Sequence, residues 1–394
     1  MLIASSYPSY VKYMGSKSKI IDFVVEGIND VRQPGQPVLD LFAGSASLAG
    51  AIGRSVDFIS NDIQSYSAVL AGAYASSWCS PQAPTSEELI GRAKNIVDDI
   101  AVSISDSIFD YCTELDIHQF LRAESIQKDL LECEFFHEWH LFLKNYSGTW
   151  WSAEQCLWID ALRQVAEEYR ETAVYDVILS SLMFAMAYCS QGTGHYAQYR
   201  DAKSESSFKD ILIYRRRDLS AYFSRKYNEA LSWLPSVARQ RAFSATSNDF
   251  SVSLNDFEGG VVYADPPYCF VHYSRFYHAL ETLIRYDYPE LQFKGGSIVK
   301  GRYRVDRHQS PFSIASQVEG AFEQLFTGVR ASGSNLVLSY SNTGMISLDR
   351  MSEIAGDIFV ANDLDLLTMD HQHMTLGRTG VRHRDVKECL LLVR

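Results

Sequence analysis

The sequence has few cysteines and no long hydrophobic run. Its seven cysteines among 394 residues form no CxxC pair and no cluster with histidine, which favours reduced thiols over a disulfide framework or a metal site. The N-terminus has no basic segment followed by an apolar stretch, and the longest apolar run, residues 177–188, is too short to span a bilayer. We therefore expect a soluble, cytoplasmic protein with no membrane partner.

The chain also lacks an excess of positive charge. Taken over the whole chain, the net charge argues against a nucleic-acid partner. The net charge is −12, but residues 84–180 hold 19 acidic and 7 basic residues and so carry the whole excess. Basic residues outnumber acidic ones by eight to four in residues 191–226 and by five to one in residues 294–308. These two segments predict a locally positive face that a polyanion can bind.

One short strand organises the rest of the chain. Residues 261–264 are apolar and rich in β-branched side chains, and the motif Asp265-Pro266-Pro267-Tyr268 follows them. The pattern predicts a buried strand. The two prolines restrict φ and donate no N–H, so Asp265 and Tyr268 would sit on a stiff turn at the carboxyl edge of a sheet. Open α/β sheets bind ligands at that edge.

The side chains of this turn suit one kind of ligand. A carboxylate, two free carbonyls and an aromatic ring can hold a planar base through its amino group while stacking on its face. The alternative is a Pro-Pro turn that only ends a strand.

Two stretches nearer the N-terminus indicate a cofactor site. Residues 10–19 form a Gly/Ser turn with three lysines, which can hold a carboxylate or phosphate or can simply face solvent. Residues 37–52 predict a strand, a turn of small residues and a helix, although Ala46 departs from a glycine-only pattern and GxGxxG is absent. Residues 56–63 predict a second strand ending in Asp62, which can accept hydrogen bonds from a ribose diol or cap the next helix.

Helical periodicity dominates from residue 84 to about residue 188, and we interpret this region as an insertion into an α/β domain. A Gly-rich loop at residues 191–200 can read base edges, and the three arginines at 215–217 form either a phosphate clamp or a solvated helix face. The closing strands are predicted at residues 358–360 and 388–393. The candidate nucleic-acid contacts are His195, Tyr196, Tyr199, Arg200, Arg215, Arg216, Arg217, Lys300, Arg302 and Arg304.

Three motifs, in this order, resemble those of the Dam-like DNA adenine-N6 methyltransferases. Residues 13–17 (Tyr-Met-Gly-Ser-Lys) resemble the N-terminal cofactor motif of that family, residues 40–45 (Asp-Leu-Phe-Ala-Gly-Ser) its Gly-rich loop, and residues 265–268 its catalytic motif. The resemblance covers both ends of the chain well and the inserted region poorly. Ala46 stands where the family often has a second glycine. The resemblance implies S-adenosylmethionine as cofactor, double-stranded DNA as substrate and no metal.

The resemblance also implies the fold. We expect an α/β protein with a Rossmann-like methyltransferase sheet and an inserted, mainly helical target-recognition region. Residues 1–83 would form the cofactor-binding part, residues 84–235 the insertion, and residues 236–394 the catalytic part.

By the same resemblance, Gly44 and its neighbours would approach the methionine part of the cofactor, Lys17 its carboxylate and Asp62 its ribose hydroxyls. A flipped adenine would stack on Tyr268, with its amino hydrogens accepted by Asp265 and the Pro266 carbonyl. Asp249 and Phe250 would lie at the adenosine ring as amino acceptor and stacking surface. The implied cofactor-binding residues are Tyr13, Met14, Gly15, Lys17, Asp40, Phe42, Ala43, Gly44, Ser45, Asp62, Asp249, Phe250 and Asp265. The implied catalytic residues are Asp265, Pro266, Pro267 and Tyr268.

The chemistry follows from the amine, whose lone pair is delocalised into the ring. Acceptors for its N–H groups favour a pyramidal nitrogen as the methyl group arrives, and this stabilisation grows toward the transition state. No covalent enzyme intermediate is required. The same geometry serves cytosine N4, RNA or a protein amide, and a non-catalytic DNA-binding subunit of a modification complex is a further alternative. The expected setting is a bacterial or phage modification or defence system, with a restriction or defence-system protein as candidate partner.

Overall fold

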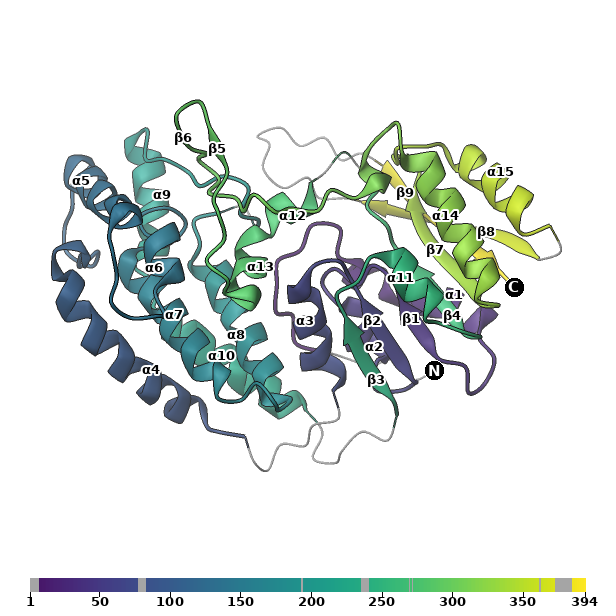
Figure 1. Cartoon of the computed structure of the whole chain (residues 1–394), viewed down its shortest axis with the longest axis horizontal. Coiled ribbons are helices and arrows are strands. Elements are labelled where there is room, and N and C mark those ends of the chain that lie inside the picture. The colour runs from purple at the N-terminus through teal and green to yellow at the C-terminus, as the bar shows by residue number, and fades with distance from the viewer. Residues whose placement is uncertain are drawn as a thin grey trace.

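The computed structural model describes residues 7–76, 83–192, 194–234, 241–268, 270, 272–360, 363–372 and 385–394. A seven-stranded sheet forms its centre, with the order β3-β2-β1-β4-β7-β9-β8 (Figure 1). The strands are β1 (Val38–Asp40), β2 (Phe58–Asn61), β3 (Phe243–Thr246), β4 (Val261–Ala264), β7 (Asn335–Ser341), β8 (Leu364–Gln372) and β9 (Asp385–Val393). Strand β9 is antiparallel to both of its neighbours, whereas the five strands from β3 to β7 pair in parallel. The predicted α/β class with a Rossmann-like sheet is confirmed.

The strand order places the ligand-binding edge. The chain runs outward from β1 through β2 to β3, and then returns to pair β4 with the other side of β1. Ligands bind open α/β sheets at such a reversal, outside the carboxyl ends of the strands. Because β1 and β4 end beside each other there, the segments following residues 40 and 264 meet at the edge of the sheet.

Helices cover both faces of the sheet. On one face lie α1 (Ile21–Val31), α2 (Ser47–Ile52) and α3 (Ser65–Ala75), and on the other lie α11 (Phe250–Asn255), α14 (Val318–Ala331) and α15 (Leu348–Ile358). Val261 and Tyr263 of β4 face the first set, while Val262 and Ala264 face the second. Burial on both faces explains why the strands read as continuous apolar runs rather than as alternating patterns.

The segment between β2 and β3 forms a lobe of helices beside the sheet, drawn in blue and teal in Figure 1. Its helices are α4 (Ser86–Ala101), α5 (Ile117–Lys128), α6 (Leu141–Tyr146), α7 (Ala153–Glu167), α8 (Val174–Cys189), α9 (Glu205–Arg215) and α10 (Leu219–Trp233). Helix α8 packs against both α3 and α10, so the lobe shares one hydrophobic core with the sheet. The domain boundaries at residues 83 and 235 stay a prediction.

The remaining elements of the described structure are short. They are α12 (Tyr273–Phe276), α13 (His278–Arg285), the antiparallel pair β5 (Phe293–Lys294) and β6 (Ser297–Ile298), and the 3-10 turns η1 (Lys17–Lys19), η3 (Val102–Ser107), η4 (Asp129–Glu132) and η5 (Pro311–Ser313). The helices in the described parts of the chain are all too short or too polar to cross a membrane.

One predicted strand is wrong. Ile358 ends α15, and the strand paired with β9 is β8, which begins at Leu364. The spacing of Met351, Ile354 and Ala355, which are buried against α14 and its neighbours, is that of a helix face. Of the short apolar run at residues 358–360, Ile358 ends the helix, Phe359 is buried just after it, and Val360 is exposed.

Candidate active site at the carboxyl edge of the sheet

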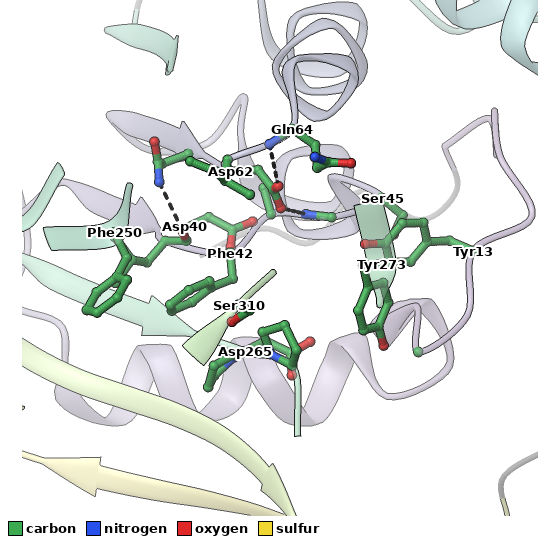
Figure 2. A pocket seen from close by; sticks show the side chains of 18 of the residues that line it. Tyr13, Asp40, Phe42, Ser45, Asp62, Gln64, Phe250, Asp265, Tyr273 and Ser310 are labelled. Carbon is green, nitrogen blue, oxygen red and sulfur yellow. Dashed lines mark hydrogen bonds between the residues drawn. The ribbon is translucent and has the colours of Figure 1, made fainter. Parts of the chain in front are cut away.

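A cavity lies where β1, β2 and β4 end. It contains about 1140 Å³ of space that protein atoms do not fill, part of it open to solvent. Every residue predicted for catalysis or cofactor binding lines this cavity except Met14. The Met14 backbone N–H instead donates to the Tyr277 hydroxyl at 2.7 Å. Figure 2 shows that the labelled side chains come from segments far apart in the sequence.

Three carboxyl groups face this space from three different strand ends. Asp40 is buried, and one of its oxygens has no hydrogen-bond partner within the described residues. Burial raises the pKa of Asp40 well above its ordinary value, and the charges of Asp265 and Asp62 add to the shift. Such a group is stabilised by a ligand that brings hydrogen-bond donors or positive charge.

Asp62 holds the turn after β1. Its two oxygens accept backbone N–H groups from Gly44 and from Gln64, each at 2.9 Å (Figure 2). Burial raises the pKa of Asp62 to about 6, and the two backbone hydrogen bonds oppose the shift. Gln64 precedes α3, so Asp62 supports the start of that helix and also faces the cavity. Both sequence-based interpretations of Asp62 therefore remain compatible with its position.

The Lys17 ammonium lies between two carboxylates. It is 3.1 Å from an oxygen of Asp265 and 3.2 Å from an oxygen of Glu388, and all three side chains are largely buried. Burial opposes the charge on Lys17, but Asp265 and Glu388 outweigh it and raise the pKa of this group. Lys17 was expected to meet the carboxylate of a cofactor. In this structure it carries a positive charge beside the acid of the catalytic motif.

Glu388 is a site residue that sequence reasoning missed. It lies on β9 opposite Ser341 of β7 and is 1% exposed. Because β9 is antiparallel, its first residues lie at the same edge as the carboxyl ends of β4 and β7. Glu388 also accepts a hydrogen bond from the Tyr268 hydroxyl at 3.4 Å, so it connects Tyr268 to Lys17. The one signal in the sequence is an acid at the start of an otherwise apolar strand.

The N-terminal motif packs on tyrosines that follow the catalytic motif. Tyr13 stacks on Tyr277 with ring centroids 4.5 Å apart and an interplanar angle of 15°, and on Tyr273 at 5.9 Å. Gly44 has a φ of +52°, and a Cβ there would lie about 3.0 Å from the Tyr13 ring. The glycine therefore admits Tyr13 to the cavity wall. Tyr273 also lines the cavity, although it was not among the site residues predicted from the sequence.

An aromatic group forms another part of the wall. Phe42 and Phe250 lie side by side in Figure 2, with centroids 5.7 Å apart, and Phe312 packs edge-on against Phe42 at 5.5 Å. Asp249, the predicted amino acceptor, caps α11 by accepting hydrogen bonds from the N–H and the hydroxyl of Ser251 at 3.0 and 2.6 Å. Both hydrogen bonds use Oδ1 of Asp249, so Oδ2 is the oxygen that can face a ligand.

Arg215 is wrong as a nucleic-acid contact. Its side chain is fully buried and forms a two-point ion pair with Glu124 at 2.9 and 2.7 Å. Its Nη1 donates to the Trp150 carbonyl at 2.8 Å, and Nη2, which also meets Glu124, donates to the Thr149 carbonyl at 2.7 Å. The guanidinium is thus committed to the core of the helical lobe.

Tyr196, Arg302 and Arg304 are also wrong as direct contacts, because folding buries them. Tyr196 is 3% exposed and Arg302 7%, and Arg302 donates to a backbone carbonyl. Arg304 is 2% exposed and forms a two-point ion pair with Asp287 at 2.8 and 2.7 Å. These side chains hold the segment after β6 in place.

The other proposed contacts stay predictions. Each keeps some exposed surface, although several already bind the protein: His195 stacks on Phe276 with centroids 4.5 Å apart, Arg200 pairs with Asp210, and Lys300 pairs with Asp201. The residues in this group are His195, Tyr199, Arg200, Arg216, Arg217 and Lys300. None of them lines the described cavity.

Comparison with known proteins gives one family. The sequence model described as D12 class N6 adenine-specific DNA methyltransferase matches residues 13–312. Modification methylase LlaI of Lactococcus lactis subsp. lactis is 22% identical over 377 residues, which cover 94% of this chain and 53% of that protein. Type II methyltransferase M.FokI of Planomicrobium okeanokoites is 22% identical over 358 residues, covering 87% of this chain and 46% of that protein. The chain therefore spans about half the length of these relatives.

Proposed function

Since this chain belongs to the D12 class N6 adenine-specific DNA methyltransferases, we propose that it transfers a methyl group from S-adenosylmethionine to the exocyclic N6 amine of adenine at specific sites in double-stranded DNA. The family expected from the three motifs is confirmed. The observation that carries the proposal is that these motifs, from residues 13, 40 and 265 onward, line a single cavity. The names of the relatives support a role in a modification system, in which a restriction or defence-system protein would be the partner.

The polar groups that line the cavity fit S-adenosylmethionine. This cofactor carries a sulfonium and an ammonium group, and the cavity offers the carboxyl groups of Asp40, Asp62 and Asp265 as acceptors. Asp40 is buried, and one of its oxygens has no hydrogen bond in the described structure. Asp62 would accept the ribose hydroxyls, and Phe250 would contact the adenine ring. When bound, the cofactor supplies a methyl group on a positively charged sulfur.

The residues of the catalytic motif would prepare the target amine. Asp265 and the Pro266 carbonyl would accept its two N–H hydrogen bonds, which favours a pyramidal nitrogen with an available lone pair. The negative charge of Asp265 would also stabilise the positive charge that develops on that nitrogen. Tyr268 would stack on the base.

Lys17 would act mainly on Asp265. An ammonium group has three donors, and two of them point at Asp265 and Glu388. The third can meet a cofactor carboxylate, so the predicted role of Lys17 in cofactor binding remains part of the proposal. Its positive charge lies beside Asp265, the proposed acceptor for the target amine.

The test is methylation of mixed-sequence duplex DNA by the purified chain, followed by sequencing that distinguishes N6-methyladenine from N4-methylcytosine. We expect N6-methyladenine within one recurring sequence. Detection of N4-methylcytosine alone would show that the enzyme methylates the cytosine amine and not the adenine amine. Absence of any modified base, from a folded protein that binds S-adenosylmethionine in calorimetry, would contradict the proposed activity and favour a non-catalytic subunit.

A further inference from the structure

Two arginines share one buried tyrosine near the cavity. The guanidinium carbons of Arg275 and Arg307 lie 5.3 and 5.0 Å from the ring centroid of Tyr303. Tyr303 is fixed, because its hydroxyl donates to the Ala197 carbonyl and its ring packs edge-on against His278 at 5.2 Å. Both guanidinium groups therefore lie against one fixed ring.

These charges are not balanced by carboxylates. Neither Arg275 nor Arg307 forms an ion pair within the described residues, although Arg304, Arg285 and Arg200 each do. The Nε of Arg275 donates to the Tyr303 hydroxyl at 2.9 Å, and its two terminal nitrogens have no hydrogen bond in the described structure. Arg307 donates from Nε to the Arg304 carbonyl at 2.8 Å and from a terminal nitrogen to the Gln292 side chain at 3.1 Å, and neither partner group carries a charge. An anion that reaches both guanidinium groups would be stabilised.

The pair lies at the rim of the cavity. Arg275 follows Tyr273 and Ser274, and Arg307 precedes His308, and all three of these neighbours line the cavity. The Ser274 hydroxyl donates to the His308 carbonyl at 2.5 Å and lies 2.9 Å from the His272 ring nitrogen, which joins the two segments. Burial lowers the pKa of His272, and the charges of Arg307 and Arg275 lower it further, which agrees with their closeness to the rim.

We propose that Arg275 and Arg307 form a clamp for the phosphates that flank the adenine entering the cavity. The inference rests on the proposed function, since an extruded nucleotide brings its own backbone to the mouth of the site. Guanidinium groups match phosphate oxygens in charge and in planar geometry. The clamp would hold the strand in register while the base occupies the cavity, without reading sequence.

The first experiment measures how duplex DNA binding by the full chain depends on salt, for Arg275→Gln, Arg307→Gln and the double variant. Each lost phosphate contact should reduce the slope of log affinity against log salt by about 0.9, and the double variant by about 1.8. Affinity at about 0.1 M salt should fall about tenfold per arginine, whatever the DNA sequence. Arg307→Lys, which keeps the charge but loses the planar fork, should keep the slope and bind more weakly.

Arg350→Gln is the matched control. It also removes one positive charge, but Arg350 pairs with Glu319 and Glu353 on the far side of the sheet from the lobe, so neither slope nor affinity should change. S-adenosylmethionine affinity, measured by calorimetry, should be equal in all variants. An unchanged salt slope in the double variant, or a loss of cofactor affinity as large as the loss of DNA affinity, would overturn the clamp.

A second experiment uses the target site found by sequencing. Methylphosphonates that replace the two phosphates flanking the target adenine should weaken binding to the wild-type chain and should cost the double variant nothing further. Equal losses in both proteins would place the contacts elsewhere. A wild-type chain that methylates DNA but fails these tests would refute the clamp alone, whereas a chain that never methylates DNA would refute the proposed function.

Discussion

The cavity at the sheet edge and the basic segments beyond it differ in how their residues are used. At the cavity, the predicted side chains from three distant motifs converge on one space. In the basic segments, three of the arginines predicted to face DNA are buried: Arg215 in an ion pair, Arg302 on a carbonyl, and Arg304 on two carboxylates. A strand end fixes where its next residues lie. The partner of a basic side chain depends instead on which acceptor the fold places beside it.

The comparison also shows why charge counts mislead in this chain. The excess acidic residues of the helical lobe partly pair with arginines of the same lobe, as Glu124 does with Arg215. Arg275 and Arg307 form no ion pair within the described residues, and the sequence had marked only one of them. Arg307 belongs to the basic segment at residues 294–308, whereas Arg275 lies outside both basic segments.

The largest effect should follow loss of the buried pair. Arg215→Leu leaves the Glu124 carboxylate buried without its partner, so the free energy of unfolding should fall by about 3–5 kcal/mol, measured by denaturant titration. The salt slope of DNA binding should not change. Combining it with Glu124→Met should restore most of the stability, because no charge is then left alone. A stable Arg215→Leu protein with a shallower slope would reinstate the phosphate role.

Asp265→Ala should impair the methyl-transfer step most. Loss of a hydrogen bond that strengthens in the transition state costs roughly 3 to 4 kcal/mol, or on the order of a hundred- to a thousandfold in rate. Single-turnover transfer from labelled cofactor to duplex DNA measures this, and binding of DNA and cofactor should persist. Asp265→Asn retains an acceptor oxygen without the charge, so it should keep partial activity at most. Wild-type rates in Asp265→Ala would refute this site.

Asp62→Asn should weaken cofactor binding by about 1 to 3 kcal/mol in calorimetry. Because burial raises the pKa of Asp62 to about 6, this group becomes protonated as the pH falls through that value and loses acceptor capacity. Wild-type affinity should therefore be highest above pH 6 and decline below it, while the Asn variant should show a flatter profile. An unchanged affinity in the variant would leave Asp62 with only its role in supporting the turn and α3.

The smallest effect concerns Ala46, which has a φ of +55° at the start of α2. A left-handed conformation costs a residue with a Cβ roughly 1–2 kcal/mol, so Ala46→Gly should raise the free energy of unfolding by up to about 1 kcal/mol after the entropy of glycine is counted. Ala51→Gly, inside α2, should do the opposite. A destabilised Ala46→Gly protein would mean that the methyl group of this buried alanine contributes more through packing than its backbone costs.

The sequence by itself determined the sheet and the position of its active edge. Apolar runs at residues 38–40 and 261–264, each followed by a turn of small residues or by prolines, are local patterns. Parallel pairing puts their carboxyl ends together, as the sequence pattern predicts for the ligand-binding edge. The assignment of Asp40, Asp62 and Asp265 to one site rested in addition on the resemblance to the methyltransferase motifs. Residues 358–360 show where prediction from local sequence fails, because three apolar residues alone do not distinguish a strand from the end of a helix.

Only the tertiary structure decided which charges meet. Glu388 reaches Lys17 and Tyr268 because an antiparallel strand brings the far end of the chain to the same edge, and no local pattern encodes that pairing. Nothing in the local sequence separates Arg215 from Arg275 in this respect. Arg215 is buried in an ion pair with Glu124, whereas Arg275 lies at the rim against the Tyr303 ring. The energy of a charge depends on its burial and on its partners, and both are set by contacts between residues far apart in the chain.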